Sequence, residues 1–182
     1  MNHLTIQQLE SGLLHIRRSP KDYGVLDLIV RRPRVEAREV LAEATLDLVE
    51  GLVGDNWRIR GSSSTADGSA HPEAQLNIMN VRAIALVAHD RERWPLAGDQ
   101  LYLDLDLSVD NLAPGTRLAL GSAVIEVTAL PHLGCKKFMA RFGEDAVKFV
   151  NSPVGKHLRL RGLNARVVQP GVIRVGDAAT KA

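Results

Sequence analysis

The sequence predicts a mainly β protein, a closed or nearly closed antiparallel β-barrel with a few peripheral helices. The second half of the chain is a succession of short aliphatic segments separated by Gly and Pro turns, which is typical of such a barrel. Apolar and polar residues alternate along the longest of these segments, as expected for a strand with one buried face. Closure into a barrel also removes exposed strand edges.

The N-terminal part predicts helices beside two strands. Apolar residues recur at spacings of three and four over residues 5–16, which begin with a capping-box pattern, so an N-terminal helix is expected there. The aliphatic run at residues 25–30 predicts a strand that Pro33 stops. Weak helical periodicity predicts a short helix over residues 36–43, and alternation predicts a strand over residues 44–49.

The middle of the chain predicts a loop followed by a capped helix. Residues 61–75 are rich in Ser, Ala and Gly and have too little apolar content to pack, so we expect a long mobile loop. This loop is either a lid over a binding site or a disordered decoration. Residues 76–79 form a short apolar segment, and Asn80 is expected to cap a helix that Pro95 and Gly98 close.

Strands dominate the second half. Residues 101–110 alternate between apolar and polar side chains, which predicts a half-buried strand with an acidic outer face. Helical spacing returns from Phe138 onward, and Gly143 is expected to divide that stretch into two short helices. The other predicted strands are 116–120 and 123–128, which form a hairpin, followed by 158–160, 165–168 and 172–175.

Length and cysteine content point to one domain in a reducing compartment. The 182 residues have the length of one domain, and we expect a single domain over residues 1–182. Cys135 is the one cysteine of the sequence, so no intramolecular disulfide forms, and a cytoplasmic location is expected. The sequence has no signal-peptide pattern and no run of ~18 apolar residues, so neither export nor a membrane span is expected.

The overall charge gives no support for a nucleic-acid partner. Lys and Arg number 23 against 21 Asp and Glu, which gives a net charge of +2, and aromatic residues make up 4% of the chain. Three separate basic clusters are present, and only folding could bring them together around an anion; otherwise each is a solvated face. They are Arg31-Arg32-Pro33-Arg34, Lys136-Lys137 through Arg141, and Lys156 through Arg161.

One short segment carries the candidate chemistry. The sequence holds no Walker A segment, no Gly-x-Gly-x-x-Gly after a strand, no His-Glu-x-x-His and no Gly-x-Ser-x-Gly. In the segment Pro131 to Phe138, Cys135 is the candidate reactive residue and His132 a candidate base. Cys135 precedes a predicted helix and stands beside two lysines, where positive potential favours the thiolate. An isolated cysteine can instead be a small buried apolar residue, and this alternative stays open.

Two further segments place polar residues next to predicted strands. Gly51 to Trp57 contains Asp55 and Asn56, and such a loop can present backbone N–H groups and a carboxylate to a polar ligand. Gly98 to Leu101 contains Gln100 and stands at the start of the acidic strand. Taken alone, each segment is an ordinary turn signal.

Together and in this order, these segments resemble the MOSC domain family, named after the C-terminal part of molybdenum cofactor sulfurases. The resemblance covers about residues 26–177 and indicates a stand-alone, bacterial-type and divergent member. The matching segments are Gly51 to Trp57, Gly98 to Leu101, the hairpin Leu120 to Thr128, the loop Pro131 to Cys135, and the last strands from Gly162 to Asp177.

The resemblance implies a barrel whose loop cysteine coordinates the molybdenum of a pterin cofactor or carries its sulfur. Cys135 is then the metal ligand, and Cys135 with His132 is the expected catalytic pair. The resemblance implies a cofactor-binding role for Asp55, Gln100 and Lys137, and we expect Asn56 and Arg141 to bind the cofactor beside them. Pyridoxal phosphate is not expected, because 182 residues leave no room for the desulfurase domain that full sulfurases carry.

The cysteine loop departs from the family pattern. It reads Pro-Arg-Ser-Pro-Cys in many members, whereas this chain has His132, Leu133 and Gly134 before the cysteine. The glycine loop continues with Asn56 and Trp57 instead of a basic residue and a histidine. This branch therefore keeps the thiol and alters its surroundings.

Three functions follow from the resemblance, and the sequence leaves them open. The first is a molybdenum-dependent oxidoreductase that reduces small N-hydroxylated substrates with electrons from a separate donor protein. The second is a sulfurtransferase in which Cys135 carries a persulfide received from a sulfur-donor protein. The third is a non-catalytic binding module.

Overall fold

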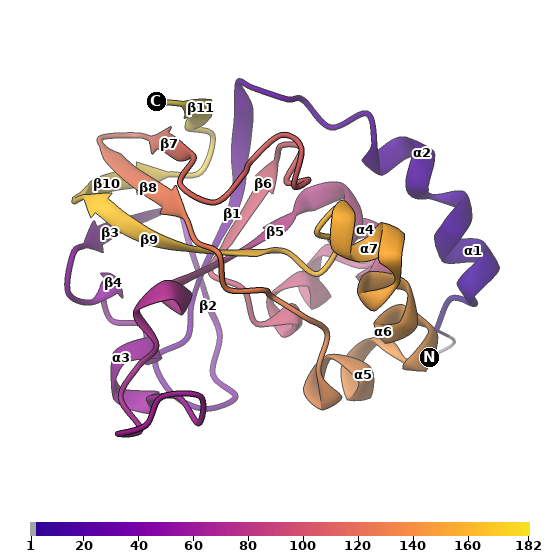
Figure 1. Cartoon of the computed structure of the whole chain (residues 1–182), viewed down its shortest axis with the longest axis horizontal. Coiled ribbons are helices and arrows are strands. Elements are labelled where there is room, and N and C mark those ends of the chain that lie inside the picture. Colours follow the sequence, from indigo (N-terminus) through magenta and orange to yellow (C-terminus); the bar gives the residue numbers. More distant parts are fainter. Residues whose placement is uncertain (1–2) are drawn as a thin grey trace.

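A closed ring of seven strands forms the centre of the computed structural model, which describes residues 3–182 (Figure 1). The first two residues of the expected domain lie outside this description. The ring runs β11, β7, β8, β9, β5, β6, β1, and β1 pairs with β11 to close it. Its strands are β1 (Gly24–Arg31), β5 (Leu76–Asn80), β6 (Leu101–Asp104), β7 (Arg117–Leu120), β8 (Ala123–Val127), β9 (Leu163–Gln169) and β11 (Ala178–Lys181). The short strand β2 (Glu39–Leu41) extends the sheet from β1.

The barrel is mixed, so the expectation of a purely antiparallel barrel is wrong. β5 and β6 run parallel, with Ile78 opposite Leu101, while the other neighbours in the ring are antiparallel. A closed ring with an odd number of strands cannot alternate direction all the way round, so at least one pair is parallel. Parallel neighbours need a crossover. Here it consists of α4 (Val81–Ala88) and the 3₁₀ segment η2 (Arg91–Ala97).

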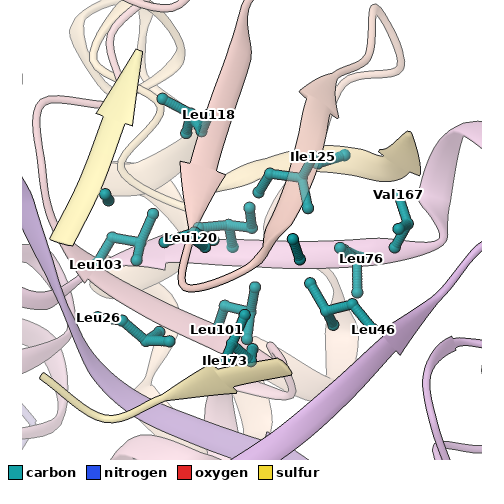
Figure 2. Close-up of a cluster of buried hydrophobic side chains, with 14 of the residues drawn as sticks. Leu26, Leu46, Leu76, Leu101, Leu103, Leu118, Leu120, Ile125, Val167 and Ile173 are labelled. Atoms are coloured by element: carbon teal, nitrogen blue, oxygen red, sulfur yellow. The ribbon is translucent and has the colours of Figure 1, made fainter. Parts of the chain in front are cut away.

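Leucine, isoleucine and valine side chains fill the barrel interior (Figure 2). Leu101 and Leu118 belong to this cluster, and both are fully buried. A second sheet of three strands contributes Leu46 and Ile173 to the same cluster. Its strands are β3 (Glu43–Asp47), β4 (Gly51–Leu52) and β10 (Gly171–Arg174). The small sheet and the ring therefore share one core.

A second apolar cluster lies between the outer face of the barrel and the helices. Leu28 and Tyr102 point into it from β1 and β6, and Phe138 and Phe149 come from the helices. Most helices gather on one side of the barrel (Figure 1). They are α4 together with α1 (Ile6–Ser11), α2 (Leu13–Ile16), α5 (Lys136–Phe142), α6 (Glu144–Asn151) and α7 (Pro153–His157). The four-residue α3 (Trp57–Arg60) lies apart from them. No helix within residues 3–182 has the length and apolarity to cross a bilayer.

Several local predictions are confirmed. Thr5 and Gln8 form the capping box, although Gly12 separates the expected N-terminal helix into α1 and α2. Asn80 caps α4 by accepting a hydrogen bond from the backbone N–H of Ala83 at 2.9 Å. The predicted strand after residue 24, the hairpin of β7 with β8, and the pair of helices around Gly143 are present.

Other predictions are wrong for reasons of tertiary structure. Residues 36–43 form a turn and β2 instead of a helix, because β2 pairs along the edge of β1. Residues 158–160 form a turn after α7, and β11 was not predicted. The strand predicted over residues 101–110 ends at Asp104. Tyr102, which was predicted to lie on the outer face, is fully buried, and its hydroxyl donates a hydrogen bond to the carbonyl of Trp94. Helices cover the side of β6 that alternation assigned to solvent.

Candidate functional site

A basic cavity of about 400 Å³ opens beside Cys135. Parts of the chain that lie far apart in sequence build it, namely the end of β1, the loop 61–75, the start of β6 and the cysteine loop. No Asp or Glu is among the residues 3–182 that line it. Its cationic lining residues are Arg32, Arg38, Arg60, Lys137, Arg141 and Arg161. An excess of fixed positive charge in a concave surface favours anionic ligands.

Cys135 lies at the edge of this cavity and is exposed. It is the N-cap of α5, and its backbone carbonyl accepts from Met139 at 2.9 Å. Asn151 of α6 fixes the preceding residue, since its side chain accepts from the N–H of Gly134 at 2.9 Å and donates to its carbonyl at 3.0 Å. A side chain at Gly134 would meet Val150 at 2.9 Å. The packing of this loop against α6 therefore explains why glycine stands here.

The deep wall, which we define as Arg32, Asp55, Asp99 and Arg161, consists of two buried ion pairs. The arginines line the cavity, and their carboxylate partners lie behind them. Arg32 donates through Nε and Nη2 to both oxygens of Asp55, at 2.9 and 2.8 Å, and its backbone N–H bonds the same carboxylate. The Nη1 group of Arg32 reaches the Asn77 side chain at 2.9 Å. Bidentate pairing of this kind fixes the position of the guanidinium as well as its charge.

A chain of buried amides connects this pair to the cysteine loop. The side-chain oxygen of Gln100 accepts from the backbone N–H of Asn77 at 2.7 Å. The Asn77 amide donates to Asn164 at 2.7 Å, and Asn164 donates to the carbonyl of Leu130 at 3.0 Å. Because all three amide side chains are buried, each hydrogen bond satisfies a group that would otherwise destabilise the fold.

Asp99 holds the second pair of the deep wall. It accepts from Arg161 at 2.7 Å and contacts His132 Nε2 at 2.8 Å, and its side chain is fully buried. Burial alone would raise the pKa of Asp99, but the charge of Arg161 and the contacts with His132 outweigh burial and lower that pKa to about 2. Burial and the charge of Arg161 lower the pKa of His132.

The rim of the cavity, which we define as Arg38 and Arg60, carries charge without a carboxylate partner. Neither guanidinium forms an ion pair with any residue of the described chain. Partial burial, and then neighbouring guanidinium groups, lower the pKa of both side chains. By contrast, Lys137 and Arg141, which also line the cavity, both pair with Glu36. The two rim arginines therefore carry positive charge that no ion pair neutralises.

The predicted site residues divide into two groups. Cys135, His132, Lys137 and Arg141 line the cavity. The other three predicted residues, Asp55, Asn56 and Gln100, are buried and do not line it. The reason is that the Asp55 carboxylate is bonded to Arg32, and the Gln100 side chain is bonded to neighbouring backbone groups. Both side chains therefore lie behind the lining residues. Asn56 donates its backbone N–H to the carbonyl of Arg32 at 2.8 Å.

Sequence reasoning did not select Arg32, Asp99, Arg161 or the rim arginines as site residues. A signal was nevertheless present, because all three basic clusters of the sequence contribute to the lining. Arg32 comes from the first cluster, Lys137 and Arg141 from the second, and Arg161 from the third. The loop 61–75 also contributes, through Ser62, Ser64 and His71. Whether this loop moves as a lid stays a prediction.

The donor set fits a metal that brings most of its own ligands. No group of three or more His, Cys, Asp or Glu side chains within residues 3–182 is placed to hold a metal ion. Cys135 alone offers a soft ligand to the cavity. A metal bound in an organic cofactor with anionic groups would suit both this single thiol and the cationic lining.

The profile of the MOSC domain matches residues 65–180, and the chain belongs to this family. Its fold resembles that of the YuaD protein from Bacillus subtilis, with a TM-score of 0.64 at 15% identity over 86% of this chain and 93% of that one. YiiM from Escherichia coli gives a TM-score of 0.56 at 17% identity over 87% of this chain and 69% of that one. YiiM from Geobacillus stearothermophilus gives 0.52 at 15% identity, covering 87% and 73%. No curated protein matches the chain.

Proposed function

We propose that the protein binds a molybdenum pterin cofactor in the basic cavity, with the Cys135 thiolate as the protein's ligand to the metal. The observation that carries this proposal is the combination of an exposed thiol with six cationic lining residues and no acidic one. Family membership supports it, because MOSC domains are associated with this cofactor. Such a cofactor carries a phosphate at one end and a metal that accepts a thiolate at the other.

Different lining residues of the cavity suit these two ends. Arg38 and Arg60 have no carboxylate partner, so a phosphate would offset the positive charge around them and accept charge-assisted hydrogen bonds. The deep wall forms a part of the binding site that is already in place, because Asp55 and Asp99 hold its arginines in position. Lys137, which lines the cavity two residues after Cys135, adds charge near the thiol.

The reaction we propose is the reduction of a small N-hydroxylated substrate. A hydroxylamine R–NHOH takes up two electrons and two protons to give R–NH₂ and water. The cofactor supplies the electron-accepting and electron-donating metal, and a separate donor protein supplies the electrons. His132 lines the cavity and is held by Asp99, so it is the group we assign to proton delivery.

A second candidate is a sulfur carrier, which the exposure of Cys135 also favours. In this function the thiolate receives one sulfur atom from a persulfide-bearing donor protein and passes it on, with no change in the metal. The third possibility, a binding module without chemistry, requires neither metal nor a reactive thiol.

The first test is the molybdenum content of the protein and of Cys135→Ser, both produced in a host that makes the pterin cofactor. We expect near-stoichiometric metal in the native chain and loss of the metal in the variant. Circular dichroism and urea unfolding serve as the fold control, because the exposed Cys135 contributes little to packing. Retention of molybdenum by Cys135→Ser would contradict the thiolate ligand.

Two further measurements separate the candidates. Arg60→Ala should lose cofactor, whereas Arg58→Ala on the same short helix should retain it, because Arg58 does not line the cavity. If both the native chain and Cys135→Ser lack metal, mass spectrometry of the fresh protein decides between the others. An added sulfur that a reductant removes from Cys135 identifies a carrier, and an unmodified, slowly alkylated thiol identifies a binding module.

A further inference from the structure

A second cavity, of about 350 Å³, adjoins the first. The linings of both include the segment Leu130 to Leu133 and Arg161, which therefore stand between the two cavities. Cys135 does not line the second cavity. Its volume lies in the range of ~300–1,000 Å³ that is common for small-molecule sites.

The walls of the second cavity combine an apolar body with cationic groups. Apolar side chains come from the turn after β6, the cysteine loop, α6 and β9, namely Val109, Leu130, Leu133, Val150 and Leu163. Lys156 and Arg159 bring positive charge, and no Asp or Glu lies among the described lining residues. The nearby carboxylate of Asp110 pairs with His157 instead, at 3.0 Å.

Arg159 lines this cavity although both its backbone conformation and the burial of its charge are unfavourable. Its backbone adopts the left-handed region with φ +50°, which disfavours any residue with a side chain. Its partly buried guanidinium has no carboxylate partner in the described chain, and burial lowers its pKa. The Nη1 group bonds the carbonyls of Leu107 and Leu112, at 3.3 and 2.6 Å, which fixes the cation without neutralising it. A fixed, uncompensated cation beside apolar walls suits an anionic group on an apolar ligand.

We infer that this second cavity binds a small organic anion, specifically an aromatic or short aliphatic carboxylate. The apolar walls take the body of the ligand, and Lys156 with Arg159 takes the carboxylate. Binding requires neither Cys135 nor a metal, so this site goes beyond the proposed function and stands or fails separately from it.

The test is a titration of the ¹⁵N-labelled protein with benzoate at constant ionic strength, followed by amide NMR. Gly155 and Gly162 line the second cavity, whereas Gly98 lines the Cys135 cavity, so three glycine amides report which cavity is filled. We expect saturable shifts at Gly155 and Gly162 and an affinity for benzoate at least about fivefold higher than for benzamide or benzylammonium.

Two variants make the location explicit. Ala129→Trp places a large side chain in the lining and should abolish the saturable shifts. Lys156→Gln should weaken benzoate binding at least about threefold, whereas Lys148→Gln, outside the cavity, should leave it unchanged. Equal binding of benzamide, shifts confined to Gly98, or unchanged affinity in Ala129→Trp would each overturn the inference.

Discussion

The deep wall and the rim of the Cys135 cavity use arginine in opposite ways. In the deep wall, Arg32 and Arg161 are almost completely buried and each is paired with a fully buried carboxylate. At the rim, Arg38 and Arg60 have no carboxylate partner, and partial burial followed by nearby guanidinium groups, Arg141 and Arg32 for Arg38 and Arg32 for Arg60, lowers the pKa of each. The deep wall therefore stabilises the fold and positions the cavity, whereas the charge of the rim remains available to a ligand.

The largest effect that this comparison predicts is on the deep wall. Asp55→Ala should lower the free energy of unfolding by about 3–5 kcal/mol, because it leaves the Arg32 guanidinium buried without a counter-charge. Urea unfolding measures this loss. The matched control is Glu39→Ala, which breaks the exposed pair with Arg31 and should cost less than about 1 kcal/mol. Equal losses in the two variants would remove the distinction between wall and surface.

The second prediction concerns the acid stability that Asp99 provides. Its folded pKa of about 2 lies below the ordinary value of 3.8, so the stabilisation is complete above pH 4. It is lost as the pH falls below about 4 and through the folded pKa. The whole pKa difference represents about 2.5 kcal/mol at the ~1.4 kcal/mol of each pKa unit, and about 2 kcal/mol of it is lost by pH 2. Unfolding measured between pH 5 and pH 2 should therefore be less pH-dependent in Asp99→Asn by this amount. An identical slope in both proteins would show that Asp99 titrates normally.

The third prediction compares two histidine–aspartate pairs. His132→Ala removes one of the two side-chain partners of the buried Asp99 and should cost about 1–2 kcal/mol. His157→Ala breaks the exposed contact with Asp110 and should cost about 0–1 kcal/mol. Thermal unfolding of both variants at pH 7 provides the comparison, and a larger loss in His157→Ala would reverse it.

The smallest effect on stability is expected at the rim. Arg60→Ala should change the free energy of unfolding by no more than about 0.5 kcal/mol, because no ion pair is broken. The same variant should weaken the binding of inorganic pyrophosphate several-fold, as measured by calorimetry, while Arg58→Ala should not. If Arg60→Ala unfolds the protein, then Arg60 has the structural role that we assign to the deep wall.

The elements that were predicted correctly are those that local sequence specifies. The β7–β8 hairpin follows from a turn between two short aliphatic runs, and the α4 cap follows from Asn80 itself. The pairing of Arg32 with Asp55 joins positions 23 residues apart, and nothing in the spacing distinguishes Arg32 from its neighbour Arg31. Only the course of the backbone at the end of β1 directs Arg32 into the buried pair with Asp55 and the preceding Arg31 toward Glu39 at the surface.

The same limit applies to the candidate site. The cysteine loop was identified because its residue types are unusual in combination, and its neighbours Lys137 and Arg141 came with it. Asp55 and Gln100 were selected as polar residues in glycine-containing turns, but their burial behind the cavity depends on contacts between distant strands. Local sequence therefore indicates which residues matter more readily than it indicates what each one contacts.

The odd number of strands in the barrel affects where the site can lie. In the parallel pair β5–β6, two neighbouring strands begin at the same end, so Asn77 near the start of one meets Gln100 just before the other. Antiparallel neighbours place a beginning beside an end and cannot bring two such starts together. Evolution can add or remove a two-stranded hairpin and keep the ring odd. Loss of a single strand would leave an even ring, in which no parallel pair is required and two such starts need not be neighbours.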